Sequence, residues 1–188
     1  MQSKYDEKSH IIELPLGLTS RIVVKDPIFP VLTTIGWEVA TNIINTLYGS
    51  MSTPVSRSWW STSSATQFLN TWTCFENQLL NSVDTDNSLN IGEIMTGNGA
   101  LLLTVQDFQR QLLLGDTQRY TLALLSDTSE QIFILHFAQK FCEVPYNDAI
   151  DTNKIRVNSI LRNSDFFQQA YQCPSDRFMN PQKKCYLF

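Results

Sequence analysis

Aromatic residues that recur about one helical turn apart are the feature of this 188-residue sequence that most restricts its fold. One row consists of Phe68, Trp72, Phe75 and Leu79, and a second consists of Phe133, Phe137 and Phe141. Spacings of three and four residues place side chains on one face of an α-helix, whereas a half-buried strand requires alternation. Such rows form a core far more often than a ligand site, so we expect packed helices.

A helix expected over residues 31–48 has a less typical composition. Ile35, Val39, Ile43 and Leu47 recur every four residues and suit one face of a helix. Several residues of this segment are β-branched, which lowers its intrinsic helix propensity. Tertiary packing must therefore hold this helix.

The remaining segments complete a mainly α fold with a short extended N-terminal segment. Ser58 is the predicted N-cap of the helix that carries the first aromatic row, with Trp59 and Trp60 in its first turn. Four more helices are predicted over about 92–114, 117–125, 129–142 and 164–172, the last beginning at Asn163 or Ser164. Prolines and a glycine interrupt residues 11–30, which we expect to be extended chain and turns.

Composition and charge exclude several classes of protein. The chain is 43% hydrophobic and 17% charged, which is typical of a globular domain. Its net charge of -4 and its lack of a basic stripe argue against nucleic-acid binding. No window reaches the roughly 20 apolar residues of a membrane span, and the polar start lacks the apolar region of a signal peptide. We expect a polar tail over 1–10 and one domain over 11–188.

Four cysteines, Cys74, Cys142, Cys173 and Cys185, allow three disulfide pairings, and their spacing alone does not choose among them. None forms a C-x-x-C motif, so the sequence does not support a zinc ribbon or a thioredoxin-type redox site.

The C-terminal stretch over 156–185 contains an Arg, a predicted helix, a Cys and the phrase M-N-P-Q-K-K-C in that order. It resembles the C-terminus of the neprilysin and endothelin-converting-enzyme family of zinc metallopeptidases. The resemblance covers the last quarter of such proteins and implies a truncated thermolysin-like (zincin) module, outside the cell or on its surface. It also implies a disulfide between Cys74 and Cys185, and it leaves Cys142 and Cys173 to pair together, stay reduced or bind another chain.

In that family the motif H-E-x-x-H holds zinc through two imidazoles on one helical face, and its Glu takes a proton from the metal-bound water. Here the matching positions read Trp37-Glu38-Val39-Ala40-Thr41. Glu38 keeps the general-base position, but an indole cannot ligate a metal and a neutral Thr hydroxyl is a poor zinc ligand.

The segment over 89–99 resembles the family motif that supplies the third zinc ligand. Glu93 matches that ligand, whereas Gly97 stands where an Asp orients a zinc-binding His. Only His10 and His136 are present, and a lone His is more often a hydrogen-bonded or surface residue than a ligand. We therefore expect no zinc in this chain, although active family members use it as their cofactor.

The resemblance also implies substrate-binding positions. Arg156 matches the Arg that hydrogen-bonds the substrate backbone, and Phe141 matches an aromatic wall of the same pocket. An internal salt bridge is the alternative role of Arg156. The position of the transition-state His corresponds to Ile150, and its loss removes an oxyanion stabiliser worth about 10²–10³ in rate.

Three functions remain open from the sequence. The first is an inactive neprilysin-like protein that binds peptides or a related peptidase subunit as a decoy or regulator. The second is a metalloendopeptidase that cleaves small peptides with an altered metal site. The third is a truncated remnant without independent function.

Overall fold

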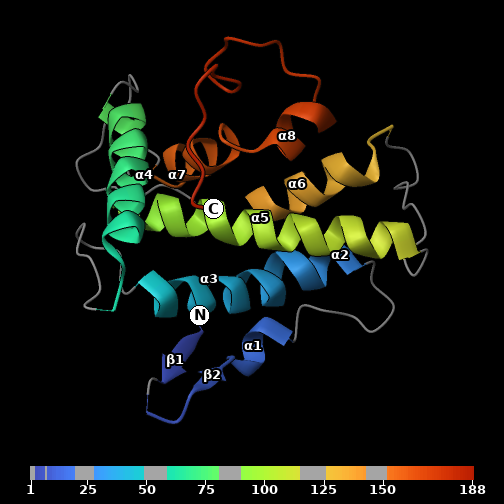
Figure 1. Cartoon of the computed structure of the whole chain (residues 1–188). Helices are drawn as coiled ribbons and strands as arrows, with labels where there is room; N and C mark the ends of the chain where they lie inside the picture. Colours follow the sequence, from blue (N-terminus) through green and yellow to red (C-terminus); the bar gives the residue numbers. More distant parts are fainter. Residues whose placement is uncertain are drawn as a thin grey trace.

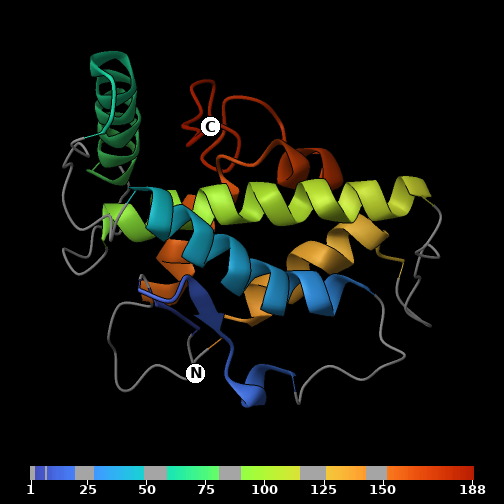
Figure 2. The ribbon, with the colours of Figure 1, turned by 60° about the horizontal axis from the view of Figure 1, so that its bottom comes forward.

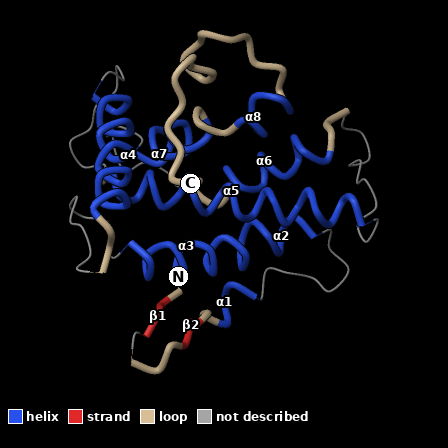
Figure 3. Tube along the Cα trace, in the orientation of Figure 1, coloured by secondary structure: helices blue, strands red, loops and turns tan. Residues whose placement is uncertain are grey.

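The computed structural model describes residues 3–6, 8–19, 28–48, 59–80, 90–114, 126–142 and 152–188. This part of the chain is mainly α, as predicted, and its two short strands lie at the N-terminal end (Figure 3). The elements are β1 (Lys4–Asp6), β2 (Ile11–Glu13), α1 (Leu16–Thr19), α2 (Ile28–Val31), the π-helix η1 (Leu32–Gly36), α3 (Trp37–Tyr48), α4 (Thr62–Leu80), α5 (Ile91–Leu114), α6 (Ser129–Gln139), α7 (Thr152–Leu161) and α8 (Asp165–Ala170).

Helix α5 is the centre of the fold and contacts η1, α3, α4 and α7 (Figure 1). In both ribbon views the β1–β2 hairpin lies on one side of α5 and α8 lies on the other (Figure 2). Gly99 permits this close packing, because a Cβ there would lie 2.7 Å from Leu187 Cδ2 and 2.9 Å from Ile44 Cδ1. The small residue therefore lets α3 and the C-terminal segment meet against the same turn of α5.

The predicted aromatic rows lie in the core. Phe68, Trp72 and Phe75 of α4 and Phe133 and Phe137 of α6 are buried. Phe108 of α5 stacks on Phe133 with ring centroids 4.7 Å apart. Because these rings fill the interior, the rows have the structural role that their spacing predicts.

The N-terminus of α8 was predicted correctly from the sequence, whereas that of α4 was not. Helix α4 begins at Thr62, and the Ser64 N–H donates to Ser61 Oγ at 3.1 Å. Trp59 and Trp60 therefore precede the helix, which corrects the prediction of a first turn beginning after Ser58; Ser58 itself lies outside the described residues. Helix α8 starts after Ser164, one of the two predicted starts, whose side chain accepts a hydrogen bond from the Phe167 N–H.

The helix predicted over 31–48 is present as α2, η1 and α3, but it begins at Ile28 and its most buried face is not the predicted row. Ile43 and Leu47 are 44% and 45% exposed. Trp37, Ala40 and Ile44 are buried instead, because this face of α3 belongs to the core cluster shared with α5. The strict four-residue row drifts around the helix, and the contact with α5 selects a different set of positions.

Three further segments differ from expectation. Within the predicted polar tail, residues 4–6 form β1, which pairs antiparallel with β2. Helix α1 adds a turn of helix within residues 11–30, and α7 was not predicted at all. The helix predicted over 117–125 lies outside the described residues.

Among the described helices, none has both the length and the apolar character that crossing a bilayer requires.

The Cys74–Cys185 disulfide implied by the resemblance is present and joins α4 to the C-terminal segment. Cys142 and Cys173 are not disulfide-bonded. Asn163, after α7, donates to Gln78 Oε1 and accepts from Gln78 Nε2 and from the Cys185 N–H. A covalent bond and a partly buried amide pair therefore attach the last residues to α4.

Candidate functional site

Trp37 begins α3 and its indole is packed among aromatic rings. Its ring centroid lies 4.8 Å from that of Phe137 and 5.9 Å from that of Phe141, which is nearly perpendicular to it. A Cβ at Gly97 would lie 2.5 Å from Ile160 Cδ1 and 3.4 Å from Trp37 Cη2. The glycine on α5 therefore makes room for the Trp37 and Ile160 side chains, and an Asp at this position would collide with Ile160.

Glu38, the next residue, lies under the same ring cluster with its side chain 9% exposed. Lys140, after α6, donates to Glu38 Oε1 at 2.5 Å, and its ammonium lies 5.3 Å from the centre of the Trp37 ring. The other carboxylate oxygen, Oε2, accepts from both the N–H and the hydroxyl of Ser3. Both oxygens of Glu38 are thus occupied by donors of the chain itself.

Burial shapes the protonation of this ion pair. It opposes ionisation of Glu38, but hydrogen bonds from Lys140 and Ser3 outweigh it and hold the pKa of the carboxyl below its usual value. Burial also lowers the pKa of Lys140, and the Glu38 carboxylate offsets part of that shift. The two groups stabilise each other as a charged pair in a partly dry environment.

Glu93, in the first turn of α5, forms a second ion pair. Arg156 of α7 donates from Nη2 to Glu93 Oε2 at 2.7 Å and from Nη1 to Asn153 Oδ1 at 3.0 Å. Glu93 is 53% exposed, so this pair is much wetter than the pair at Glu38. Arg156 Nε is buried and has no hydrogen-bond partner among the described residues.

The other side chains considered as metal ligands also form hydrogen bonds within the chain. The Thr41 hydroxyl donates to the carbonyl oxygen of Trp37 at 2.8 Å. His136 Nδ1 is hydrogen-bonded to Thr33 Oγ1 at 2.7 Å, and His10 Nδ1 is hydrogen-bonded to the Tyr5 hydroxyl at the same distance. Within the described residues no three His, Cys, Asp or Glu side chains gather in a group that could hold a metal ion.

Comparison with known proteins identifies the family. A model of Peptidase family M13 matches residues 40–187, which is most of the chain. The chain belongs to peptidase family M13. It is 30% identical over 142 residues to endothelin-converting enzyme 1 of Cavia porcellus and of Mus musculus, and 28% identical over 148 residues to neprilysin of Oryctolagus cuniculus.

The chain spans about a fifth of the length of these M13 relatives. The alignments cover 69% of this chain against the endothelin-converting enzymes and 68% against neprilysin, but only 18–19% of each relative. Thr41 and Glu93 lie inside the region that matches the M13 model, whereas Trp37 and Glu38 lie just before its start at residue 40. The assignment of Trp37 and Glu38 to the M13 zinc motif therefore remains a prediction.

The donor set at these positions does not fit the zinc ion that the M13 relatives imply. Zinc sites need three or four N, S or O ligands, and this site offers an indole, a hydroxyl already used on its own helix and two carboxylates. Each carboxylate is paired with a cation, Glu38 with Lys140 and Glu93 with Arg156. A divalent cation would have to displace both pairs without an imidazole or thiolate to bind it.

The structure brings several of the residues singled out in the sequence into contact with one another. Trp37, Glu38 and Phe141 share one cluster, and Glu93 meets Arg156 in the internal salt bridge considered as its alternative role. The substrate-binding roles of Arg156 and Phe141 remain predictions, and Ile150 lies outside the described residues.

Sequence reasoning missed two residues of the site, Lys140 and Ser3. Lys140 lies 102 residues after Glu38, and Ser3 lies 35 residues before it. The local signal for Lys140 was its position directly before Phe141, the last ring of the second aromatic row.

Proposed function

We propose that this chain is a non-hydrolytic member of peptidase family M13 that binds an extended peptide without cutting it. One observation carries the absence of hydrolysis: both carboxylates assigned to the zinc site are neutralised by the chain's own cations. The ammonium of Lys140 and the guanidinium of Arg156 supply the positive charge that a metal ion supplies in an active site of this kind.

The hydrolytic reaction needs a carboxylate that is free to take a proton from water. Both oxygens of Glu38 accept hydrogen bonds from Lys140 and Ser3, and the lowered pKa of this carboxyl makes it a weaker base. Trp37 occupies the space beside Glu38 and packs against Phe141. These contacts support the proposal that the former catalytic residues of this site now have a structural role.

Peptide binding is supported by the hairpin next to this site. Strand β1 pairs with β2 along one edge, and among the described residues its other edge has no strand partner. An open edge offers a row of backbone N–H and C=O groups, to which an extended peptide adds as a further strand. Ser3, which precedes β1, contacts Glu38, so a bound peptide would run past the converted site.

A location in an oxidising compartment fits this proposal. The Cys74–Cys185 disulfide persists in extracellular or secretory environments and is reduced in the cytosol. Peptides outside the cell are accordingly the proposed ligands.

Metal analysis combined with a cleavage assay tests the absence of hydrolysis. We expect the purified chain, incubated with zinc and then desalted, to retain less than one ion per chain and to leave a fluorogenic peptide library intact. Stoichiometric zinc together with chelator-sensitive cleavage would overturn the proposal in favour of a metalloendopeptidase. The Glu38→Gln variant is the control, because contaminating proteases would cleave equally in its presence.

Peptide binding is tested separately by following the backbone amides of residues 4–6 by NMR during titration with unstructured peptides of mixed sequence. Strand addition predicts saturable shifts and slower solvent exchange in these amides. Shifts confined to other parts of the molecule, or none, would contradict the proposed binding mode and leave the metal result unaffected.

A further inference from the structure

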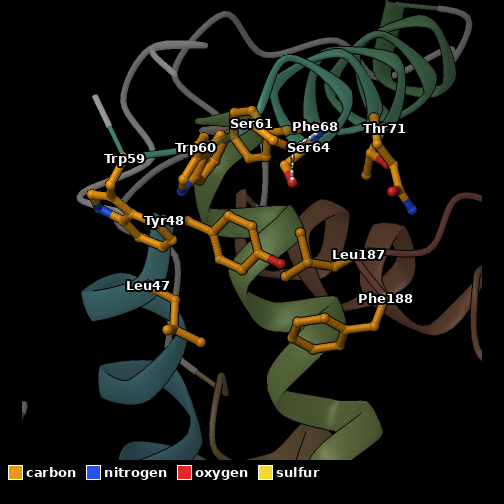
Figure 4. Close-up of a pocket in the computed structure, with 11 residues that line it drawn as sticks. Leu47, Tyr48, Trp59, Trp60, Ser61, Ser64, Phe68, Thr71, Leu187 and Phe188 are labelled. Atoms are coloured by element: carbon orange, nitrogen blue, oxygen red, sulfur yellow. Dashed lines mark hydrogen bonds between the residues drawn. The ribbon is translucent and has the colours of Figure 1, made fainter. Parts of the chain in front are cut away.

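A cavity of about 380 Å³ lies between the C-terminal end of α3, the start of α4 and the last residues of the chain (Figure 4). Leu47 lies nine residues after Glu38 on the same helix, which is about 14 Å along the helix axis. The cavity is therefore separate from the converted zinc site. Its volume falls within the range of small-molecule sites, about 300–1,000 Å³.

Five of the eleven described residues that line the cavity are aromatic. Tyr48 stacks on Phe68 with centroids 5.5 Å apart, and Trp60 meets Phe68 edge-on at 5.0 Å. Trp59 is perpendicular to Trp60 at 6.0 Å, and Phe188 lies 6.2 Å from Tyr48. Because the inner rings contact one another, the wall exists before any ligand binds, which reduces the ordering that binding would require.

Two of the rings are unusually exposed for their size. Trp59 is 69% exposed and Phe188 is 53% exposed, and both line the cavity. Large apolar groups gathered around one concavity typically mark a binding site, whereas single exposed apolar residues are common.

The described side chains that line the cavity include no Asp, Glu, Lys, Arg or His. Polar groups there are hydroxyls and an amide, among them the Tyr48 hydroxyl, which points toward Leu187 in Figure 4. Burial raises the pKa of Tyr48, so its hydroxyl keeps its proton near neutral pH. A neutral donor in an apolar wall suits an uncharged ligand that carries an oxygen or nitrogen acceptor.

We propose that this cavity binds an uncharged aromatic group, held between Trp59, Trp60 and Phe188 and oriented by a hydrogen bond from the Tyr48 hydroxyl. The group belongs either to a free small molecule or to the aromatic side chain of a peptide, because both present the same ring chemistry.

Three naphthalene probes that share the ring and carry a neutral, an anionic or a cationic substituent test the ligand class by isothermal titration calorimetry. We expect 2-naphthol to bind in a saturable one-to-one manner, and 2-naphthalenesulfonate and 2-naphthylmethylammonium to bind at least tenfold more weakly. Tighter binding of the ammonium would show a cation–π site and overturn the proposal, as would equal binding of all three probes.

Matched variants test the location of the site. Gln67→Trp, at the mouth of the cavity, should abolish binding, whereas Asn70→Trp, on α4 but outside the cavity, should preserve it. Trp59→Ala should weaken binding about tenfold, and Leu80→Ala, a residue with the same 69% exposure on α4, should leave it unchanged. If the two members of either pair behave alike, the site is elsewhere and the proposal fails.

The Tyr48→Phe variant tests the hydrogen bond. Its affinity for 2-naphthol should fall about fivefold, a typical value for one neutral hydrogen bond. Binding of 2-methylnaphthalene, which has no oxygen, should not change. A fall for both probes would show that the ring wall has been disturbed and would contradict the orienting role of the hydroxyl.

Two further titrations distinguish the sources of the ring. Tighter binding of Gly-Gly-Trp-Gly-Gly than of N-acetyl-tryptophan amide indicates a peptide ligand, and the reverse order indicates a small molecule. If 2-naphthol binds only after residues 49–58 are replaced by a Gly/Ser linker, the chain itself supplies the occupant and the proposal of an external ligand is wrong.

Discussion

The Glu38 site and the C-terminal attachment use different means to satisfy buried polar groups. At the C-terminal attachment, Asn163 is 1% exposed and exchanges neutral hydrogen bonds with Gln78, while the disulfide fixes the C-terminal segment beside it. At the site, Glu38 is nearly as buried but is satisfied by a charge, Lys140. Neutral pairs keep their strength over a wide pH range, whereas a charged pair depends on both protonation states.

This difference teaches which part of the M13 scaffold depends on buried charge. The buried contacts of the C-terminal attachment are made by amides, a backbone N–H and two cysteines, and its ion pair between Lys184 and Asp165 involves an exposed carboxylate. Around α3, Trp37 packs against Phe137, the Lys140 ammonium lies over the Trp37 ring, and Gly97 leaves room for the indole. If the proposed loss of the zinc ligands is correct, we expect compensation around α3 and none at the C-terminal attachment.

The largest effect on stability is expected from the disulfide. The Cys74→Ala/Cys185→Ala variant should lose about 4 kcal/mol of unfolding free energy, because the bridge closes a long loop of the unfolded chain. Urea denaturation followed by circular dichroism measures the loss. The exposed, unpaired Cys142 provides a control, since Cys142→Ser should change stability by less than about 0.5 kcal/mol. A loss below about 1 kcal/mol in the double variant would show that the amide contacts suffice.

The second largest effect is expected at Lys140. Replacing it by Met leaves Glu38 buried with only Ser3 and should cost about 2 kcal/mol, less than a fully buried pair because Lys140 is partly exposed. The double variant Lys140→Met/Glu38→Gln removes both charges and should recover most of the loss. Chemical denaturation of the four proteins in the cycle gives the coupling energy. Additive losses of unfolding free energy would contradict the inference that Lys140 stabilises the fold through its ion pair with Glu38.

The sequence predicted the helices whose apolar residues follow a clear period. It missed α7, in which the buried Ile155 and Ile160 are five residues apart with mostly polar residues between them and give no regular row. It singled out Glu38 and Glu93, whose assignment to the zinc-site positions stays a prediction. It could not show that Lys140 reaches Glu38, because the contact depends on how α6 packs beside α3 and not on any local spacing.

A smaller effect is expected from acid. The folded-state pKa of Glu38 is lowered, so its stabilising contribution is present above the ordinary value of 4.5 and is lost as the pH falls through the folded value. Asp165, whose pKa is lowered by a hydrogen bond from Lys184, acts in the same direction at the C-terminal attachment. Thermal melts between pH 7 and 3 should show a shallower acid slope for Glu38→Gln than for the native protein.

At the C-terminal attachment we expect a smaller dependence of stability on pH, because the Asp165 side chain is 57% exposed. Solvent screens such a pair, so Asp165→Asn should change the acid slope less than Glu38→Gln does. An equal or larger change for Asp165→Asn would mean that the two regions depend on charge to the same degree.

The smallest effect is expected at Arg156, although its ion pair with Glu93 also belongs to the predicted zinc site. Glu93 is 53% exposed, and pairs of this kind contribute about 0.5 kcal/mol or less. The buried Nε of Arg156 lacks a partner among the described residues, so part of the desolvation cost is not recovered. Arg156→Met should therefore change the unfolding free energy by less than about 0.5 kcal/mol in urea titrations, while Lys140→Met costs several times more. If Arg156→Met lowers the unfolding free energy as much as Lys140→Met does, burial does not explain the difference between the two ion pairs. Helix α7 would then depend on the Arg156 guanidinium as strongly as α3 depends on the Lys140 ammonium.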